Sequence, residues 1–320
     1  MFGKIKFYLR THFNKLHNIW KSIGYCKKNI RYYSRLRFKN IKNKNVLFFV
    51  VDPNLKHPGL ADRFKAIIGC YYIAVKNNYN FKIIYKTPFP LENFITENKV
   101  KWIADFKDLE YSIGYTKFST YRGAMELPRL KANKQYHCYN YNGSNLLKNI
   151  TSNCDVLWSK LYNDLFKPTD RLQSALNKVN IKPKTYIAIH LRFVNALESF
   201  EIGHYNNLDD EKKTNLINRC KNKIREIIKN TSMPVLVFSD SKIFLNAIKD
   251  MNVIILNPND IGHISFSNDD SNFLKTFIDF YMISNASIVY RVIAPEMYSS
   301  TCFSKYAAIA GNAKFIDLHI

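Results

Sequence analysis

Short apolar runs alternate with amphipathic stretches along most of this chain, and that alternation limits the possible folds most strongly. The segment Val46–Val51 (VLFFVV) is a continuous apolar run of the length expected for a strand buried on both faces. A helical pattern of apolar residues begins at about Ala61, and residues 81–85 (FKIIY) resemble a second strand. Alternating strands and helices predict an α/β fold, in which parallel sheets carry helices on both faces.

The second half of the chain continues this alternation. Its predicted elements are strands at 186–191, 235–238, 253–256 and 288–290, and helices within 209–229, after Ser241, from a cap at Ser271, and from about Phe303. Pro168 and Pro183 flank a short charged helix, which places the domain boundary near 167–184. Residues 87–165 mix short elements, and no topology is predicted for them.

The first 44 residues form a basic arm with 13 Lys and Arg and no acidic residue. This arm carries more than half of the net charge of +23. On a helix the apolar residues share one face and most of the cations share the other; the apolar set is Ile5, Leu9, Phe13, Leu16, Ile19, Trp20 and Ile23. This pattern predicts a helix lying on an anionic membrane surface, and a helix docked on the protein's own core is the alternative.

The arm also bears on localisation. Lys4, Lys6 and Arg10 interrupt any apolar signal-peptide core, and no stretch approaches eighteen uncharged apolar residues. We therefore expect a cytoplasmic protein that is peripheral on the inner face of the cell membrane. The six cysteines show no CxxC spacing, which favours free thiols in a reducing compartment.

Several function classes are disfavoured by what the chain lacks. There is no convincing DxD, HxxxH or clustered His/Cys pattern for a divalent metal. A basic nucleic-acid-binding protein is a rival interpretation, but the charge is concentrated in the arm and no RNA-binding or zinc-finger motif accompanies it. A noncatalytic factor for surface-polysaccharide assembly is a further rival, which only an assay separates.

Ligands bind at the carboxyl ends of strands in open parallel sheets, so the polar residues there are the candidates for chemistry. His190 and Arg192 end a strand and point to the same side, where Arg can fork onto a phosphate and His can donate beside it. Asp240 and Ser241 end the next strand and could contact a base or ribose, or simply cap the following helix. A salt bridge at a strand end is the corresponding structural alternative for His190 and Arg192.

Two loops complete the candidate site. The turn at 298–304 (YSSTCFS) carries hydroxyls in front of the last helix, as phosphate-binding turns do. An ordinary Ser/Thr helix cap would show the same sequence pattern. In the first half, residues 57–63 (HPGLADR) join the first strand to the first helix, and Gly59 would allow a ligand to approach the backbone closely.

Taken in order, four segments resemble the α-1,2/α-1,6/O-fucosyltransferase superfamily. They are HPGLADRFKAIIGCYYIA at 57–74, IAIHLRF at 187–193, VFSDS at 237–241, and the closing block DFYMISNASIVYRV with YSSTCFSKYAAIAG at 279–311. The resemblance covers roughly 46–85 and 185–315. Phe193 and Asn195 depart from the residues that follow HxR in many relatives, and Ala61 replaces a glycine found in others.

The resemblance implies a GT-B architecture of two facing Rossmann-like domains. Residues 45–167 would form the acceptor domain and residues 168–320 the nucleotide-sugar domain, behind the arm at 1–44. It further implies an inverting enzyme that needs no divalent metal and no cofactor and uses GDP-fucose as donor. A glycosyltransferase of the same fold with another nucleotide sugar is the alternative. The acceptor would be a hydroxyl of a cell-surface glycan precursor of the lipopolysaccharide or O-antigen type, free or lipid-linked.

The resemblance also assigns roles to residues. His190 and Arg192 would hold the diphosphate, Asp240 and Ser241 would contact guanosine, and the phosphate end would be shaped by Ser300, Thr301, Phe303 and Ser304. Gly59 and Arg63 belong to the glycine-loop segment and are included among the donor-binding residues. For the general base that accepts the acceptor proton, Glu198 is the first choice and Glu201 the second.

Overall fold

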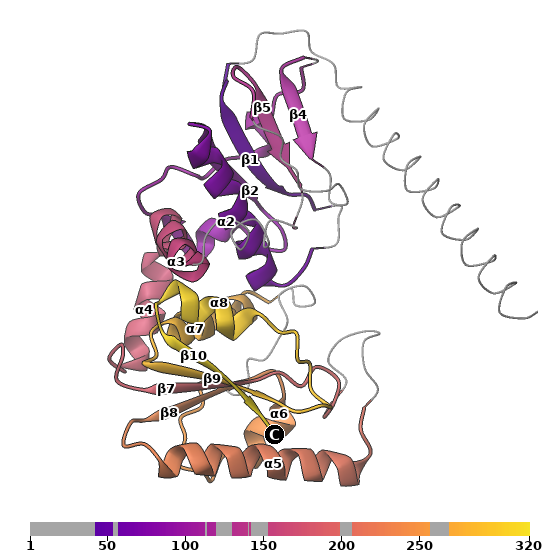
Figure 1. The fold of residues 1–320 in the computed structure, drawn as a ribbon, viewed down its shortest axis with the longest axis vertical. Helices are drawn as coiled ribbons and strands as arrows, with labels where there is room; N and C mark the ends of the chain where they lie inside the picture. Colours follow the sequence, from indigo (N-terminus) through magenta and orange to yellow (C-terminus); the bar gives the residue numbers. More distant parts are fainter. Residues whose placement is uncertain are drawn as a thin grey trace, which may run out of the picture.

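The computed structural model describes residues 42–53, 57–112, 114–119, 130–139, 141, 153–198, 207–256 and 269–320. The predicted amphipathic helix of the arm and Glu201 lie outside these residues. The described chain forms two four-stranded parallel sheets with helices packed around them (Figure 1). Within the described residues, no helix is both long enough and apolar enough to span a membrane.

The first sheet has the order β2-β1-β5-β4, and all of its pairings are parallel. Its strands are β1 (Val46–Val51), β2 (Asn80–Tyr85), β4 (Thr116–Ser119) and β5 (Gln135–Cys138). Every residue of β1 is buried, as the unbroken apolar run predicts. The helix α2 (Leu60–Lys76) returns the chain from β1 to β2 and buries Phe64, Ile67 and Ile68 against the sheet.

The region without a predicted topology consists of short elements around this sheet. They are η1 (Leu91–Asn93), β3 (Ile95–Glu97), η2 (Phe106–Asp108), β4, β5, the helix α3 (Cys154–Leu165) and β6 (Phe166–Pro168). Strands β3 and β6 pair antiparallel as a separate two-stranded sheet. Four of these elements are only three residues long, which explains why no periodicity is visible in the sequence.

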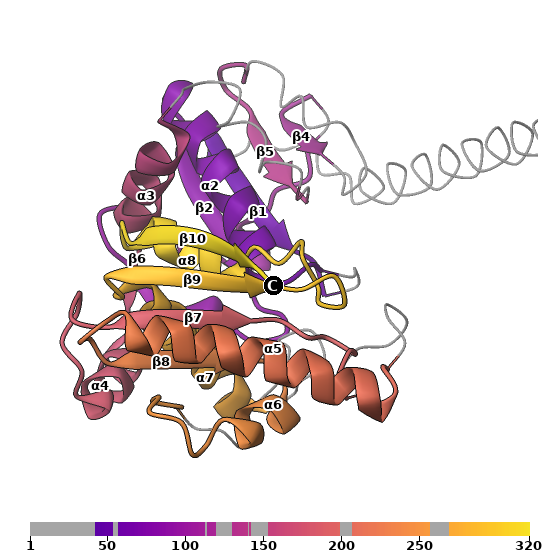
Figure 2. The same ribbon diagram turned by 60° about the horizontal axis from the view of Figure 1, so that its bottom comes forward.

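The second sheet has the order β10-β9-β7-β8 and is also parallel throughout. Its strands are β7 (Ile187–Leu191), β8 (Val235–Ser239), β9 (Ile288–Ile293) and β10 (Lys314–His319). The helix α5 (Asp210–Lys229) covers one face, and α7 (Asp270–Ser284) and α8 (Phe303–Ala310) cover the other (Figure 2). A short helix, α6 (Lys242–Ala247), follows β8.

Two predictions for this half need correction, and one strand was not predicted. The strand expected at 253–256 is reduced to a single bridge between Ile254 and Leu236. Asp269, rather than Ser271, caps α7, because its carboxylate accepts from the Ser271 amide at 3.0 Å. The strand β10 was not predicted, because its half-exposed residues at the sheet edge lack an unbroken apolar run.

One aromatic core joins the two sheets. Phe94 stacks on Phe277 of α7 with centroids 4.8 Å apart and planes 12° apart. Phe64 of α2 contacts Phe280 of α7 at 5.3 Å, and Tyr162 of α3 contacts both of these rings. Because these buried rings come from both halves, they fix how the two sheets face one another.

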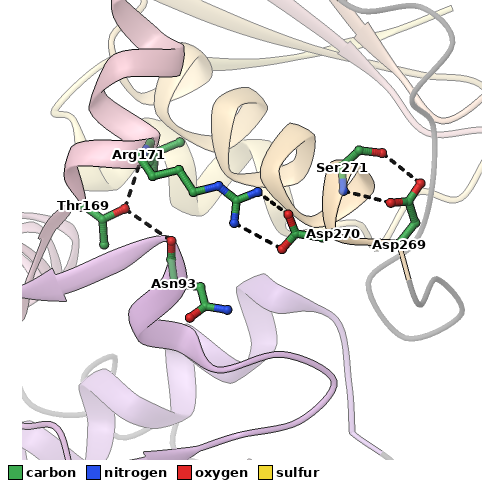
Figure 3. A network of polar contacts seen from close by, with 7 residues as sticks. Asn93, Thr169, Arg171, Asp269, Asp270 and Ser271 are labelled. Carbon is green, nitrogen blue, oxygen red and sulfur yellow. Dashed lines mark hydrogen bonds and ion pairs between the residues drawn. The ribbon is translucent and has the colours of Figure 1, made fainter.

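The helix α4 (Asp170–Val179) connects the halves and is tied to each of them (Figure 3). Its N-cap residue Thr169 donates to the carbonyls of Asn93 at 3.3 Å and Phe94 at 3.2 Å. Arg171 forks onto Asp270 at the start of α7, with one N–O distance of 3.1 Å. The predicted charged helix between Pro168 and Pro183 therefore forms where expected and packs against α7.

Lys184, a few residues after α4, binds the C-terminal ends of α7 and α8. Its ammonium donates to three carbonyls at the C-terminal ends of α7 and α8, those of Ser284 (3.2 Å), Ala286 (3.0 Å) and Gly311 (2.7 Å). Gly311 approaches α7 so closely that a Cβ there would lie 1.9 Å from the Ser284 carbonyl oxygen. A side chain larger than hydrogen at 311 would push the two helices apart.

Candidate active site

Each sheet has a point at which the chain changes direction across the strands. In the second sheet β7 is followed by β8 on one side, and the chain later enters β9 on the other side of β7. Ligands of open α/β sheets bind in the crevice at the carboxyl ends of the strands at such a switch point. His190 of β7 pairs in register with Arg291 of β9, so both side chains belong to one face beside this crevice.

His190 is buried, with 6% of its surface exposed. Its Nδ1 has no hydrogen-bond partner within the described protein, and its ring lies 5.9 Å from that of Phe303. Burial, followed by the charges of Arg192 and Arg291, lowers the pKa of His190 to about 3. The imidazole is therefore neutral at physiological pH and offers a hydrogen bond rather than a charge.

Asp240 holds the turn after β7. Its carboxylate accepts from the amides of Phe193 at 2.8 Å and Val194 at 2.9 Å, and it pairs with Nε of Arg192 at 3.3 Å. Val194 has a φ of 55°, a conformation unfavourable for a β-branched residue. Burial raises the pKa of Asp240, whereas Arg192 and the two amides lower it.

The residue after the HxR pattern, Phe193, has a packing role. Its ring is 1% exposed and lies 4.9 Å from Phe244 of α6. The neighbouring turn is also attached to the 298–304 loop, because the amide of Tyr298 donates to the carbonyl of Arg192 at 3.2 Å. The structure thus brings the HxR segment, the SD segment and the hydroxyl-rich turn together, as the sequence analysis expected.

Arg291 is a site residue that the sequence analysis missed. Its guanidinium forks onto Asp317 of β10 at 2.6 and 2.8 Å, and it also donates to the carbonyl of Thr301. It therefore anchors the hydroxyl-rich turn to the sheet. The available signal was a charge inside the apolar run of β9 (IVYRVI), since charged residues are rarely buried without a specific partner.

The turn at 298–304 opens α8. Ser300 is exposed and Thr301 is buried, and Phe303 lies with its ring between those of His190 and Phe280. The N-cap, Cys302, makes no side-chain capping bond. Ser304 is completely buried, and within the described residues its hydroxyl has no hydrogen-bond partner.

The predicted guanosine contacts have other partners here. Ser241 is 1% exposed and caps α6 by accepting from the Phe244 amide at 3.2 Å. The carboxylate of Asp240 is engaged with the turn after β7, as described above. The capping alternative therefore accounts for Ser241, and a contact of either residue with guanosine stays a prediction.

Of the two candidate bases, the structure describes Glu198. The Glu198 carboxylate accepts from the amide of Ile243, in the first turn of α6, at 3.4 Å. It lies after β7 on a partly buried turn. Glu201 lies outside the described residues.

Arg63 of the glycine-loop segment is bonded to several parts of the first half. Arg63 is 1% exposed and donates to the Pro58 carbonyl at 2.8 Å, the Tyr85 hydroxyl at 2.7 Å and the Thr87 carbonyl at 3.1 Å. Gly59 precedes α2 with φ −60° and ψ 166°, values that any residue adopts. These bonds give Arg63 a structural role, and its predicted donor contact stays untested.

Lys65, in the first half, is a second cation that was not selected from the sequence. Lys65 of α2 pairs with Asp62 and lies 5.4 Å from the ring centroid of Tyr306 in α8. Burial lowers the pKa of Lys65, but Asp62 and the Cys302 thiol raise it, and the net direction is upward. The first turns of α2 therefore lie beside the start of α8 (Figure 1).

The second half thus presents guanidinium groups, a neutral imidazole and a buried hydroxyl at one switch point. Buried polar atoms without a partner are rare, and each typically costs about 1–3 kcal/mol. Such donors, beside a helix N-terminus, suit a phosphate group. Among the described residues, no three His, Cys, Asp or Glu side chains converge as metal ligands would.

Two fucosyltransferases are among the solved structures to which this chain is similar. The chain aligns with NodZ alpha-1,6-fucosyltransferase soaked with GDP-fucose (TM-score 0.54, 12% identity, 83% of this chain and 92% of that one). It aligns similarly with a mutant of Arabidopsis thaliana FUT1 in complex with GDP (TM-score 0.55, 11% identity, 91% and 74%). The chain has the GT-B fold of these fucosyltransferases. No protein-family model and no curated protein sequence matches it.

The fucosyltransferase fold confirms the predicted fold class and agrees with the family to which the sequence motifs point. NodZ was also crystallised with GDP, and that structure covers 83% of this chain at a TM-score of 0.53. At 11–12% identity these likenesses extend to the fold alone.

Proposed function

We propose that the chain is an inverting glycosyltransferase that transfers fucose from GDP-fucose to a hydroxyl of a cell-surface glycan precursor. The observation that carries the proposal is the pair of buried, unpartnered polar atoms, His190 Nδ1 and Ser304 Oγ. Arg291 pairs in register with His190, and Arg192 follows His190 by two residues. A nucleoside diphosphate would supply the acceptor oxygens that these groups lack. The NodZ structure soaked with GDP-fucose supports this choice of donor.

In this proposal the residues stabilise the leaving group without a divalent metal. As the bond from the sugar to the diphosphate breaks, negative charge grows on the phosphate oxygens. Arg192 and the amides at the start of α8 would oppose that charge, and His190 and Ser304 would each donate a hydrogen bond. One well-placed donor of this kind contributes roughly 3 kcal/mol, a hundredfold or more in rate.

The fixed partners of the site favour preorganisation. Asp240 aims Arg192, while Asp317 and Thr301 hold Arg291, so neither guanidinium must be ordered when the donor binds. Thr301, Phe303 and Ser300 would shape the phosphate end of the site. For the base, Glu198 and Glu201 stay the predictions from sequence.

A donor panel tests the proposal. The purified protein is incubated in EDTA with GDP-fucose, GDP-mannose or UDP-galactose, each radiolabelled in the sugar, with bacterial lipid-linked glycans added as acceptors. We expect labelled product from GDP-fucose alone, with inverted configuration at the anomeric carbon. Transfer from another donor, or transfer only after a divalent metal is restored, would contradict the proposal.

We further propose that residues 1–44 bring this activity to the anionic inner face of the cell membrane, where a lipid-linked acceptor would be presented. The support is the arm's composition, 13 cations and no acid, together with its two-sided helical pattern.

A further inference from the structure

The first sheet has a switch point of its own, and two polar side chains meet across it. The strand β1 lies between β2, which follows it in the chain, and β5, which is entered later on the other side. The crevice between the carboxyl ends of β1 and β5 is therefore the ligand position of this sheet. His57 lies beyond the end of β1 and Tyr141 lies beyond the end of β5.

The hydrogen bonds of His57 fix its tautomer. Its Nε2 lies 2.5 Å from the backbone oxygen of Asp52, and its Nδ1 lies 2.5 Å from the hydroxyl of Tyr141. A carbonyl oxygen can only accept, so Nε2 carries the proton. Nδ1 of the neutral ring then has a lone pair, and the Tyr141 hydroxyl donates to it.

The pair is placed to meet a substrate. Both residues are half-buried, so part of each reaches the surface. Three residues after His57 the chain enters α2, whose Lys65 contacts Tyr306 at the start of α8. The first two turns of α2 therefore lead from His57 to the helix terminus proposed above to hold the diphosphate (Figure 1).

We propose that Tyr141 and His57 form the proton relay that activates the acceptor hydroxyl, with Tyr141 as the catalytic residue that touches the acceptor. This inference rests on the proposed function. The acceptor O–H proton passes to Tyr141 Oη, and the Tyr141 proton passes to His57 Nδ1. The acceptor oxygen bonds to the anomeric carbon as the bond to the diphosphate breaks, and that electron pair leaves with GDP. The Asp52 carbonyl stabilises the resulting imidazolium through Nε2–H.

The surroundings keep the relay in its accepting state. Burial lowers the pKa of His57, and the charge of Arg63 lowers it further, whereas the carbonyl and the charge of Asp52 raise it; the net direction is downward. These are the described charged groups that act on the ring, together with the Tyr141 hydroxyl that bonds to it. The ring is then neutral near pH 7 and can take up a proton.

An NMR titration tests the hydrogen bond without requiring turnover. The His57 ring signal is assigned from its loss in His57→Gln, and its midpoint should lie below 6.5. Since the Tyr141 hydroxyl stabilises the neutral ring, Tyr141→Phe should raise that midpoint, whereas Tyr72→Phe on the outer part of α2 should not. A midpoint unmoved by Tyr141→Phe would overturn the relay.

Release of GDP from GDP-fucose, with water or added galactose as the acceptor, tests the catalytic role. Tyr141→Phe and His57→Gln should each lower kcat by about a hundredfold or more, and the double variant should be little worse than either. The acid limb of kcat/KM should disappear in His57→Gln and persist in His319→Gln, an exposed control on β10. GDP should raise the melting temperature of every variant as it does for the wild type.

The outcomes separate the two proposals. If GDP does not stabilise even the wild type, the proposed function fails. If GDP binds and GDP-fucose is turned over, but the Tyr141 and His57 variants keep wild-type rates and pH profiles, the relay is wrong. Loss of turnover in Glu198→Gln with no loss in His57→Gln would return the base to the carboxylate predicted from sequence.

Discussion

Replacing Asp240 with alanine should both destabilise the protein and lower its affinity for GDP. The substitution leaves the buried amides of Phe193 and Val194 without their acceptor and removes an ion-pair partner of Arg192. Each orphaned buried donor costs about 1–3 kcal/mol, and losing one member of a buried ion pair adds to that. Because Arg192 keeps some contact with water, with 18% of its side chain exposed, we expect a total loss of about 3–5 kcal/mol.

Asp240→Asn should cost about half as much, since one oxygen remains to accept from one of the two amides. Urea unfolding followed by tryptophan fluorescence measures both variants, with Asp250→Ala, at an exposed position after α6, as the matched control. GDP affinity should fall at least about tenfold in Asp240→Ala, because Arg192 is no longer aimed at the diphosphate. An unfolding midpoint equal to that of Asp250→Ala would refute the role given to Asp240.

Three further perturbations test separate parts of the account. Burial lowers the pKa of His137 to about 3. Between pH 6.5 and 3 the unfolded state therefore binds a proton that the folded state does not. Lowering the pH through this range should reduce the free energy of unfolding by up to about 1.4 kcal/mol per pH unit from this group. His137→Gln should flatten that slope, and an unchanged slope would contradict the assignment. Lys184→Met should lose about 1–2 kcal/mol, since the part-buried bonds to Ser284 and Ala286 are lost while water can replace the exposed bond to Gly311. Lys178→Met, also at an exposed position, should be near neutral, and equal effects of the two variants would count against the cap. Full-length protein should bind anionic vesicles less tightly as salt rises, and removal of residues 1–40 should abolish binding while leaving a folded protein; binding that survives truncation would refute the membrane role of the arm.

The parts of the fold that could be predicted are those whose periodicity is unbroken. The all-apolar β1 and the amphipathic helices α2 and α5 form within a residue or so of the expected positions. The three-residue strands β3 and β6 and the edge strand β10 are too short or too mixed in polarity to show a period of two.

The site divides in the same way. His190, Arg192 and the turn before α8 could be selected because polar residues that follow an apolar run mark the carboxyl end of a strand. Arg291 left one sign in the sequence, a charge inside an apolar run, but its place beside His190 could not be predicted, nor could the pairing of His57 with Tyr141, because both depend on strand order. That order places β9 beside β7 and β5 beside β1, and it is a long-range property that local patterns do not encode.

The central claim is that cationic and hydrogen-bonding side chains, without a metal, hold a nucleoside diphosphate at the switch point of the second sheet. The most direct test is the melting temperature of the protein with GDP in the presence of EDTA. At a GDP concentration a hundred times its Kd, binding should stabilise the wild type by about 2.7 kcal/mol. Arg192→Ala should abolish the shift, and Arg225→Ala, at an exposed position on α5, should preserve it. A shift that appears only with Mn²⁺, or that survives Arg192→Ala, would contradict the account.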